Sequence, residues 1–93
     1  MYASFRYYPG SAEFVDLLVE NEDAVKSLIS EIDGFRAYYL VRTDDGSAVS
    51  LSVFDDKDGA DKSNEAAAGW VRENAADMNV SANISGGEVE ISF

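Results

Sequence analysis

Along this 93-residue chain, segments whose apolar residues have the two-residue period of a strand alternate with segments whose apolar residues have the 3.6-residue period of a helix. Residues 2–8 are rich in aromatic side chains and end at Pro9 and Gly10, a pattern that predicts a strand followed by a turn. Between residues 12 and 32 seven apolar residues, at positions 14, 17, 18, 25, 28, 29 and 32, share one arc about 120° wide, which predicts an amphipathic helix. A strand is therefore followed by a helix at the start of the chain.

The rest of the chain repeats this alternation around a central hairpin. Residues 35–43 and 47–54 are predicted strands joined by a turn at residues 44–46. We expect Asp58 to cap a second helix, which a looser stretch connects to a last strand. The apolar side of that last strand is formed by Val89, Ile91 and Phe93.

The resulting order is βαββαβ, in one domain over residues 1–93. Short connections and right-handed crossovers favour one compact arrangement of these elements. This is the α+β ferredoxin-like fold, a four-stranded antiparallel sheet with both helices on one face.

Each predicted strand has two faces, and one of them must pack against the helices. The more apolar set is the natural choice for that packing, and it includes Phe5, Tyr39 and Leu51. The opposite face still carries large side chains, namely Tyr2, Arg6, Tyr8, Tyr38, Leu40 and Phe54. Such a patch is typical of an interface, so we expect these residues to form an isologous homodimer through the sheet faces. The alternative is a monomer with a partly solvated sheet.

Composition excludes several classes of function. Eighteen acidic against seven basic residues give a net charge of −11, so we expect no nucleic-acid or membrane partner. The chain has no cysteine and no histidine, and its acidic run at residues 55–61 is explained by helix capping, so we expect neither a metal nor a cofactor. The start of the chain lacks the pattern of a targeting signal, which favours a cytoplasmic location. The acidity fits either an ordinary soluble protein or a salt-adapted surface.

Polar side chains at helix positions that should be buried are the candidates for a ligand pocket. Asn21 and Asn64 fall within the apolar arcs of the two predicted helices, and a buried amide without a partner costs about 1–3 kcal/mol. Either a ligand or a backbone carbonyl can satisfy such a group. The pocket candidates are Asn21, Ser63, Asn64, Trp70, Asn74 and Tyr39.

Three segments give the chain a family resemblance. The start Met-Tyr-Ala-Ser-Phe-Arg-Tyr-Tyr, the run from Ile32 to Val41 and the segment from Val49 to Asp56 resemble the antibiotic-biosynthesis-monooxygenase-like group of the dimeric α/β-barrel superfamily. The second helix, with Asn64 and Trp70, resembles it too. The resemblance implies two sheets packed face to face across a dimer, with a ligand cleft between each sheet and its own helices.

The resemblance also implies a reaction. Cofactor-independent oxygenases of the group form an anion of an aromatic substrate that reacts with oxygen, and some use an asparagine, a tryptophan and an arginine. In this chain Asn64 and Trp70 lie about 120° apart around their helix, and no arginine completes the set, so we assign no catalytic residue. Haem-degrading relatives use a histidine that this chain lacks.

Two functions therefore remain open at this stage. The first is a dimeric barrel that binds a small apolar or aromatic molecule, with oxygenation of that molecule as its reaction. The second is a non-catalytic dimeric binding or interaction module. A cleft of a few hundred Å³ in each subunit favours the first function, and a filled core favours the second.

Overall fold

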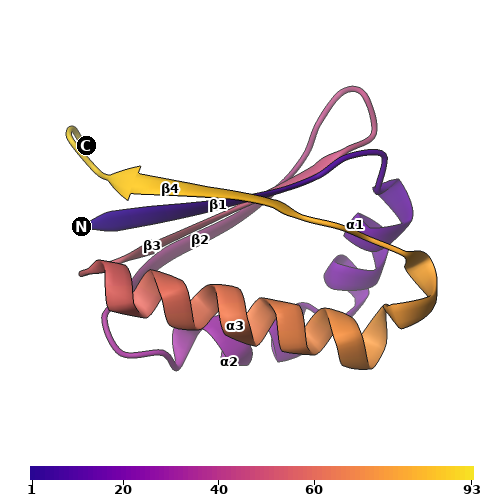
Figure 1. The fold of residues 1–93 in the computed structure, drawn as a ribbon, viewed down its shortest axis with the longest axis horizontal. Coiled ribbons are helices and arrows are strands. Elements are labelled where there is room, and N and C mark those ends of the chain that lie inside the picture. The colour runs from indigo at the N-terminus through magenta and orange to yellow at the C-terminus, as the bar shows by residue number, and fades with distance from the viewer.

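The computed structural model describes all 93 residues. Figure 1 shows its helices on one side of a sheet whose other side is uncovered. The elements are β1 (Tyr2–Tyr8), α1 (Ala12–Glu20), α2 (Glu22–Ser30), β2 (Phe35–Arg42), β3 (Ala48–Phe54), α3 (Lys57–Asn74), a 3₁₀ turn (Ala76–Met78) and β4 (Asn83–Glu88). No helix combines the length and the hydropathy that a membrane span requires.

The four strands form one antiparallel sheet in the order β2-β3-β1-β4. The strands β1 and β3, which are distant in sequence, pair at its centre, and β4 returns to the free edge of β1. This is the predicted ferredoxin-like arrangement, and the fold class is confirmed.

The predicted helix over residues 12–32 is interrupted at Asn21, which separates α1 from α2. The Asn21 side chain donates a hydrogen bond to the backbone oxygen of Leu17 at 2.8 Å. Asparagine readily exchanges helical backbone bonds for such local bonds, so the chain bends there while the apolar side of both helices still faces the sheet.

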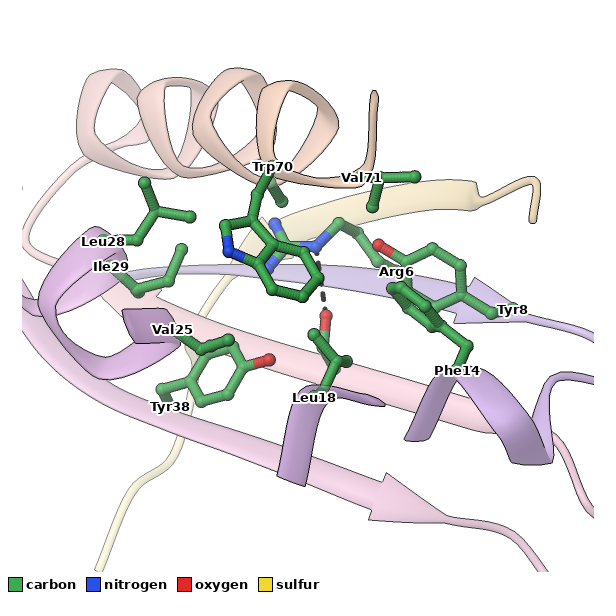
Figure 2. Close-up of a pocket in the computed structure, with 12 residues that line it drawn as sticks. Arg6, Tyr8, Phe14, Leu18, Val25, Leu28, Ile29, Tyr38, Trp70 and Val71 are labelled. Carbon is green, nitrogen blue, oxygen red and sulfur yellow. Dashed lines mark hydrogen bonds between the residues drawn. The ribbon is translucent and has the colours of Figure 1, made fainter. Parts of the chain in front are cut away.

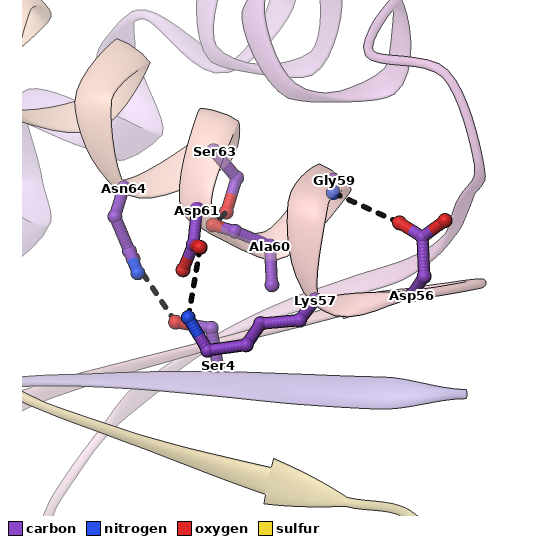
Figure 3. A network of polar contacts seen from close by, with 8 residues as sticks. All are labelled: Ser4, Asp56, Lys57, Gly59, Ala60, Asp61, Ser63 and Asn64. Atoms are coloured by element: carbon purple, nitrogen blue, oxygen red, sulfur yellow. Dashed lines mark hydrogen bonds and ion pairs between the residues drawn. The ribbon is translucent and has the colours of Figure 1, made fainter.

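The third helix begins earlier than the sequence suggested. Asp56, and not Asp58, is the N-cap of α3, because its carboxylate accepts the backbone N–H of Gly59 at 3.1 Å (Figure 3). Gly59 is also required for packing, since an added Cβ would lie 2.8 Å from the ring of Phe54. The start of α3 therefore lies directly against β3.

The last strand is Asn83–Glu88, and the prediction that Val89, Ile91 and Phe93 face the helices is wrong. Tyr2 of β1 pairs with Glu88, and the Val89 N–H donates to the Met1 oxygen at 2.9 Å, so the first residue of the chain is already used and nothing is left to pair with residues 90–93. Ile91 and Phe93 are exposed as a result. The two glycines 86 and 87, which suggest a turn, lie inside the strand, where a Cβ on Gly86 would approach the Ala3 oxygen to 2.9 Å.

The prediction of which sheet face the helices cover is also wrong. The six residues predicted for the dimer interface lie on the helix side of the sheet, here called the covered face: Tyr2, Arg6, Tyr8, Tyr38, Leu40 and Phe54. The reason is the close approach of α3, which buries Ala60 and Ser63 completely. The strand positions opposite it must be small, and they are Ser4, Ser50 and Ser52.

The more apolar set forms the opposite side, here called the open face. Phe5, Tyr39 and Leu51 lie side by side across β1, β3 and β2, and 59% of Tyr39 is exposed. One expected helix-facing residue of β2 does face the helices. A bulge between Phe35 and Ala37 turns Phe35 to the covered face, where its ring packs edge-on against Phe54 at 5.8 Å.

Candidate functional site

A small cavity lies between the covered face and the three helices (Figure 2). Its volume is about 20 Å³, which is room for about one water molecule. Apolar residues of the helices form most of its wall: Phe14, Leu18, Val25, Leu28, Ile29 and Val71. The polar part of the wall comes from the sheet and consists of Arg6, Tyr8, Tyr38 and Ser50.

Arg6 is the centre of the polar part, and only 3% of it is exposed. Its Nε donates to the hydroxyl oxygen of Ser50 at 3.0 Å and its Nη2 to that of Ser52 at 3.2 Å. Its Nη1 donates to Oδ1 of Asn64 at 2.6 Å. The same Oδ1 accepts the Ser4 hydroxyl at 3.0 Å, so one amide oxygen connects α3 to β1. Figure 3 shows the Asn64 side chain extending from α3 toward Ser4.

Two tyrosines lie beside the guanidinium, Tyr8 on β1 and Tyr38 on β2. In Figure 2 the hydroxyls of Tyr8 and Tyr38 point toward the interior of the cavity. Burial raises the pKa of both hydroxyls above the ordinary value of 10.0, and the charge of Arg6 acts against that increase. Both side chains are therefore neutral phenols at physiological pH, and each can donate a hydrogen bond.

Trp70 covers the cavity from above. Its indole extends from α3 toward the sheet and lies between Arg6 and the apolar residues of α2 (Figure 2). Because it is the only tryptophan of the chain, its fluorescence reports on this cavity alone.

A second, open groove of about 460 Å³ lies beside the cavity, between β2 and the helices α1 and α2. Most of the residues that line it are apolar, and they include Val19, Phe35 and Leu40. Four residues line both spaces: Leu18, Val25, Ile29 and Tyr38. The small cavity is thus separated from a solvent-accessible groove by one layer of side chains.

The structure brings together only part of the predicted pocket. Trp70 lines the cavity, and Asn64 is hydrogen-bonded to Arg6 beside it. Ser63 is buried, but its hydroxyl donates to the Ala60 oxygen at 2.7 Å, a local helix bond.

The other three candidates lie elsewhere. Asn21 bonds to its own helix, and Asn74 is exposed and bonds to the Trp70 oxygen at 2.9 Å. Tyr39 lies on the open face, away from the cavity.

Sequence reasoning missed Arg6, Tyr8 and Tyr38 as cavity residues because it placed them on the dimer side of the sheet. The sequence did contain a signal for this placement. Ser50 and Ser52 lie on the same face of β3, and they pair with Arg6 and Ser4 of β1. Small hydroxyl residues facing one arginine are typical of a buried guanidinium with neutral acceptors.

The acidic run before and within α3 is already engaged in local interactions. Asp55 pairs with Arg36 at 2.5 Å, and Asp61 pairs with Lys57 at 2.9 Å (Figure 3). No group of three or more acidic, histidine or cysteine side chains is placed to hold a metal ion.

The comparisons with known proteins agree on the fold. No protein-family model matches the sequence, and no curated protein matches it. Among solved structures, a point variant of MhuD with two manganese protoporphyrin IX molecules per active site has a TM-score of 0.74 at 13% identity, over 100% of this chain and 98% of that one.

Two further structures point to one group. A protein from Deinococcus radiodurans, provisionally assigned as an antibiotic biosynthesis monooxygenase, has a TM-score of 0.66 at 18% identity, over 100% of this chain and 96% of that one. SnoaB, a cofactor-independent oxygenase from Streptomyces nogalater, has a TM-score of 0.62 at 16% identity, over 98% of this chain and 93% of that one. The chain shares the fold of these proteins. At these identities the likeness concerns the fold, and the site of this chain must be argued from its own residues.

Proposed function

We propose that this chain binds a small apolar or aromatic molecule between its sheet and its helices, and that it oxygenates that molecule without a cofactor. The observation that carries the proposal is the juxtaposition of a buried guanidinium, two phenol hydroxyls and an indole in an otherwise apolar cavity. A few convergent polar groups in an apolar cavity are typical of small-molecule sites. The fold shared with SnoaB, a cofactor-independent oxygenase, supports the reaction class.

The reaction needs no redox group from the protein. A substrate CH₂ group that is made acidic by neighbouring carbonyl groups loses a proton, and the resulting anion passes its electrons to O₂. One oxygen atom is retained as a new carbonyl group and the other leaves as water, so CH₂ and O₂ yield C=O and H₂O. The protein contributes binding, exclusion of water and stabilisation of the anion.

We propose that the working form is a homodimer formed through the open face. The side chains of that face are Ala3, Phe5, Tyr7, Ala37, Tyr39, Val41, Val49, Leu51 and Val53 on the three strands β1 to β3. None of them is charged, although the chain has 25 charged residues, the sum of 18 acidic and 7 basic ones. A second copy of the same face is the occupant that matches an uncharged, self-complementary surface.

Two measurements test the proposed function. Dithranol, an anthrone with an acidic CH₂ group, is expected to quench Trp70 fluorescence saturably and to consume one O₂ per molecule in an oxygen electrode. Trp70→Phe abolishes the optical signal while calorimetry still detects binding, which serves as the control. Absence of binding across dithranol, naphthols and naphthamides would contradict the proposed function.

The second candidate is a non-catalytic binding module, and the small volume of the cavity favours it. That function predicts saturable binding of the same aromatic molecules with oxygen consumption no faster than in buffer. The two functions are therefore separated by the oxygen electrode and not by the binding measurement.

A further inference from the structure

The guanidinium of Arg6 carries a buried positive charge that no carboxylate of the chain compensates. The three ion pairs of the structure involve Arg36, Arg42 and Lys57, and all lie at the surface. Arg6 takes part in none of them, although 18 acidic residues are available. Its acceptors are two serine hydroxyls and one amide oxygen, all neutral.

A buried charge without a counterion is unfavourable, and removal from water is only partly offset by neutral hydrogen-bond acceptors. A guanidinium has five N–H groups, and Arg6 uses three of them in the bonds described above. The other two, one on each terminal nitrogen, lie on the side of the Tyr8 and Tyr38 hydroxyls, whose pKa values burial raises and the Arg6 side chain lowers by its charge and by hydrogen bonding. The hydroxyls of Tyr8 and Tyr38 add two neutral donors beside them.

We propose that Arg6, Tyr8 and Tyr38 bind an anionic oxygen group of the ligand, so that the substrate class is an aromatic or apolar acid. The inference rests on the proposed function, since it assigns the chemistry of the molecule bound at the same cavity. A carboxylate and an ionised phenol or enol present the same anionic oxygen, and the ligand itself supplies the negative charge that Arg6 lacks. Charge-assisted bonds from a buried arginine are short and strong, which makes the anion the anchor of the complex.

The two adjacent spaces accommodate the two halves of such a ligand. The cavity of about 20 Å³ beside Arg6 has room for one oxygen atom of the anionic group, which is the size of a water molecule, and the groove of about 460 Å³ suits the rest of the ligand. The layer shared by both spaces contains Leu18 and Tyr38, so the ligand enters between α1 and β2. Binding then brings the Tyr38 hydroxyl and the guanidinium to the same oxygen group.

A matched pair of ligands tests the anion directly. In calorimetric titrations at pH 7.5, 2-naphthoate is expected to bind at least about tenfold more tightly than 2-naphthamide, which has the same rings without the charge. The net charge of −11 works against this result, because the overall field of the protein repels anions. A preference for the anion therefore has to come from a local site.

A third ligand identifies the source of the anionic oxygen. If 2-naphthol binds with the absorption spectrum of its anion, the site accepts phenolates as well as carboxylates. If naphthoate binds and naphthol does not ionise, the site is specific for carboxylates.

Two variants locate the preference at Arg6. Arg6→Met is expected to reduce naphthoate affinity to that of naphthamide, whereas Arg36→Met, which removes an exposed arginine, keeps the difference. Asn64→Asp places a carboxylate at the atom that already accepts the Nη1 bond, and no donor bond of the Asn64 amide is lost. It is expected to raise the melting temperature and to weaken naphthoate binding about tenfold or more.

The outcomes separate the two proposals. Equal binding of naphthoate and naphthamide, or an anion preference that survives in both Arg6→Met and Asn64→Asp, overturns the anion site and leaves the proposed function intact. If neither naphthalene binds although dithranol does, only the anion site is overturned, and if dithranol and the naphthols do not bind either, the proposed function itself fails. If Arg6→Met does not fold, the comparison of naphthoate with naphthamide and the Asn64→Asp variant still decide whether the anion site exists.

Discussion

At the scale of single residues, the cavity shows how burial sets protonation. Tyr8 and Tyr38 lie beneath the helices next to a positive charge, and desolvation raises their pKa values more strongly than Arg6 lowers them. In the unfolded chain the same hydroxyls ionise near pH 10. Above that pH the unfolded state has released protons that the native state still holds, so the free energy of unfolding falls as pH rises.

Removing the two hydroxyls should therefore make the free energy of unfolding fall less steeply as the pH rises through the alkaline range. The double variant Tyr8→Phe, Tyr38→Phe is expected to lose less stability than the wild type between pH 9.5 and pH 11, because it has two fewer protons to release on unfolding. Urea unfolding followed by circular dichroism at several pH values measures this. Parallel profiles for the two proteins would show that burial does not hold these protons.

At the scale of elements, the sequence supports the order of strands and helices better than their orientation. Alternation separates each strand into two faces, but the assumption that the more apolar face meets the helices is wrong here. The close approach of α3 selects Ser4, Ser50 and Ser52 for the covered face, and an open face that is apolar suits contact with a second copy. The bulge at Phe35 depends on the register of β2 against β3, which no local pattern encodes.

The candidate site was predictable to a similar extent. Asn64 and Trp70 were identified because their helix positions are defined by periodicity within one element. Arg6 was missed because its burial depends on two strands and a helix meeting at one point. The same reason explains β4, whose start and end follow from pairing with β1 and not from its own glycines.

Two glycines of α3 provide an element-scale prediction with an internal control. Gly59→Ala forces a Cβ to within 2.8 Å of the Phe54 ring and should lower the free energy of unfolding by about 1–3 kcal/mol. In Gly69→Ala the added Cβ contacts only the end of the Arg72 side chain, at 3.7 Å. This variant should raise the free energy of unfolding by about 0.5–1 kcal/mol, because alanine has the better helix propensity. Urea unfolding of both variants checks the pair, and shifts of the same sign would contradict the packing of α3 on β3.

At the scale of the whole molecule, charge is distributed so that one face is free of it. The 18 acidic residues keep most of the surface strongly negative, which opposes contact between copies wherever those residues lie. The open face has no charged side chain on β1 to β3, so it is the part of the surface where two copies would repel each other least. The distribution of charge therefore supports the open face as the surface of the proposed dimer.

One charge on that face should disrupt the proposed dimer. Tyr39→Glu places a carboxylate on β2 beside Leu51, where two copies would bury it against its own symmetry mate or against apolar side chains. We expect the wild type to sediment at twice 10.1 kDa and this variant at 10.1 kDa. Ala68→Glu, which adds the same charge at an exposed position of α3, controls for net charge and should remain dimeric. A wild type of 10.1 kDa at micromolar concentration, or loss of the dimer in both variants, would show that the open face is not where two copies meet.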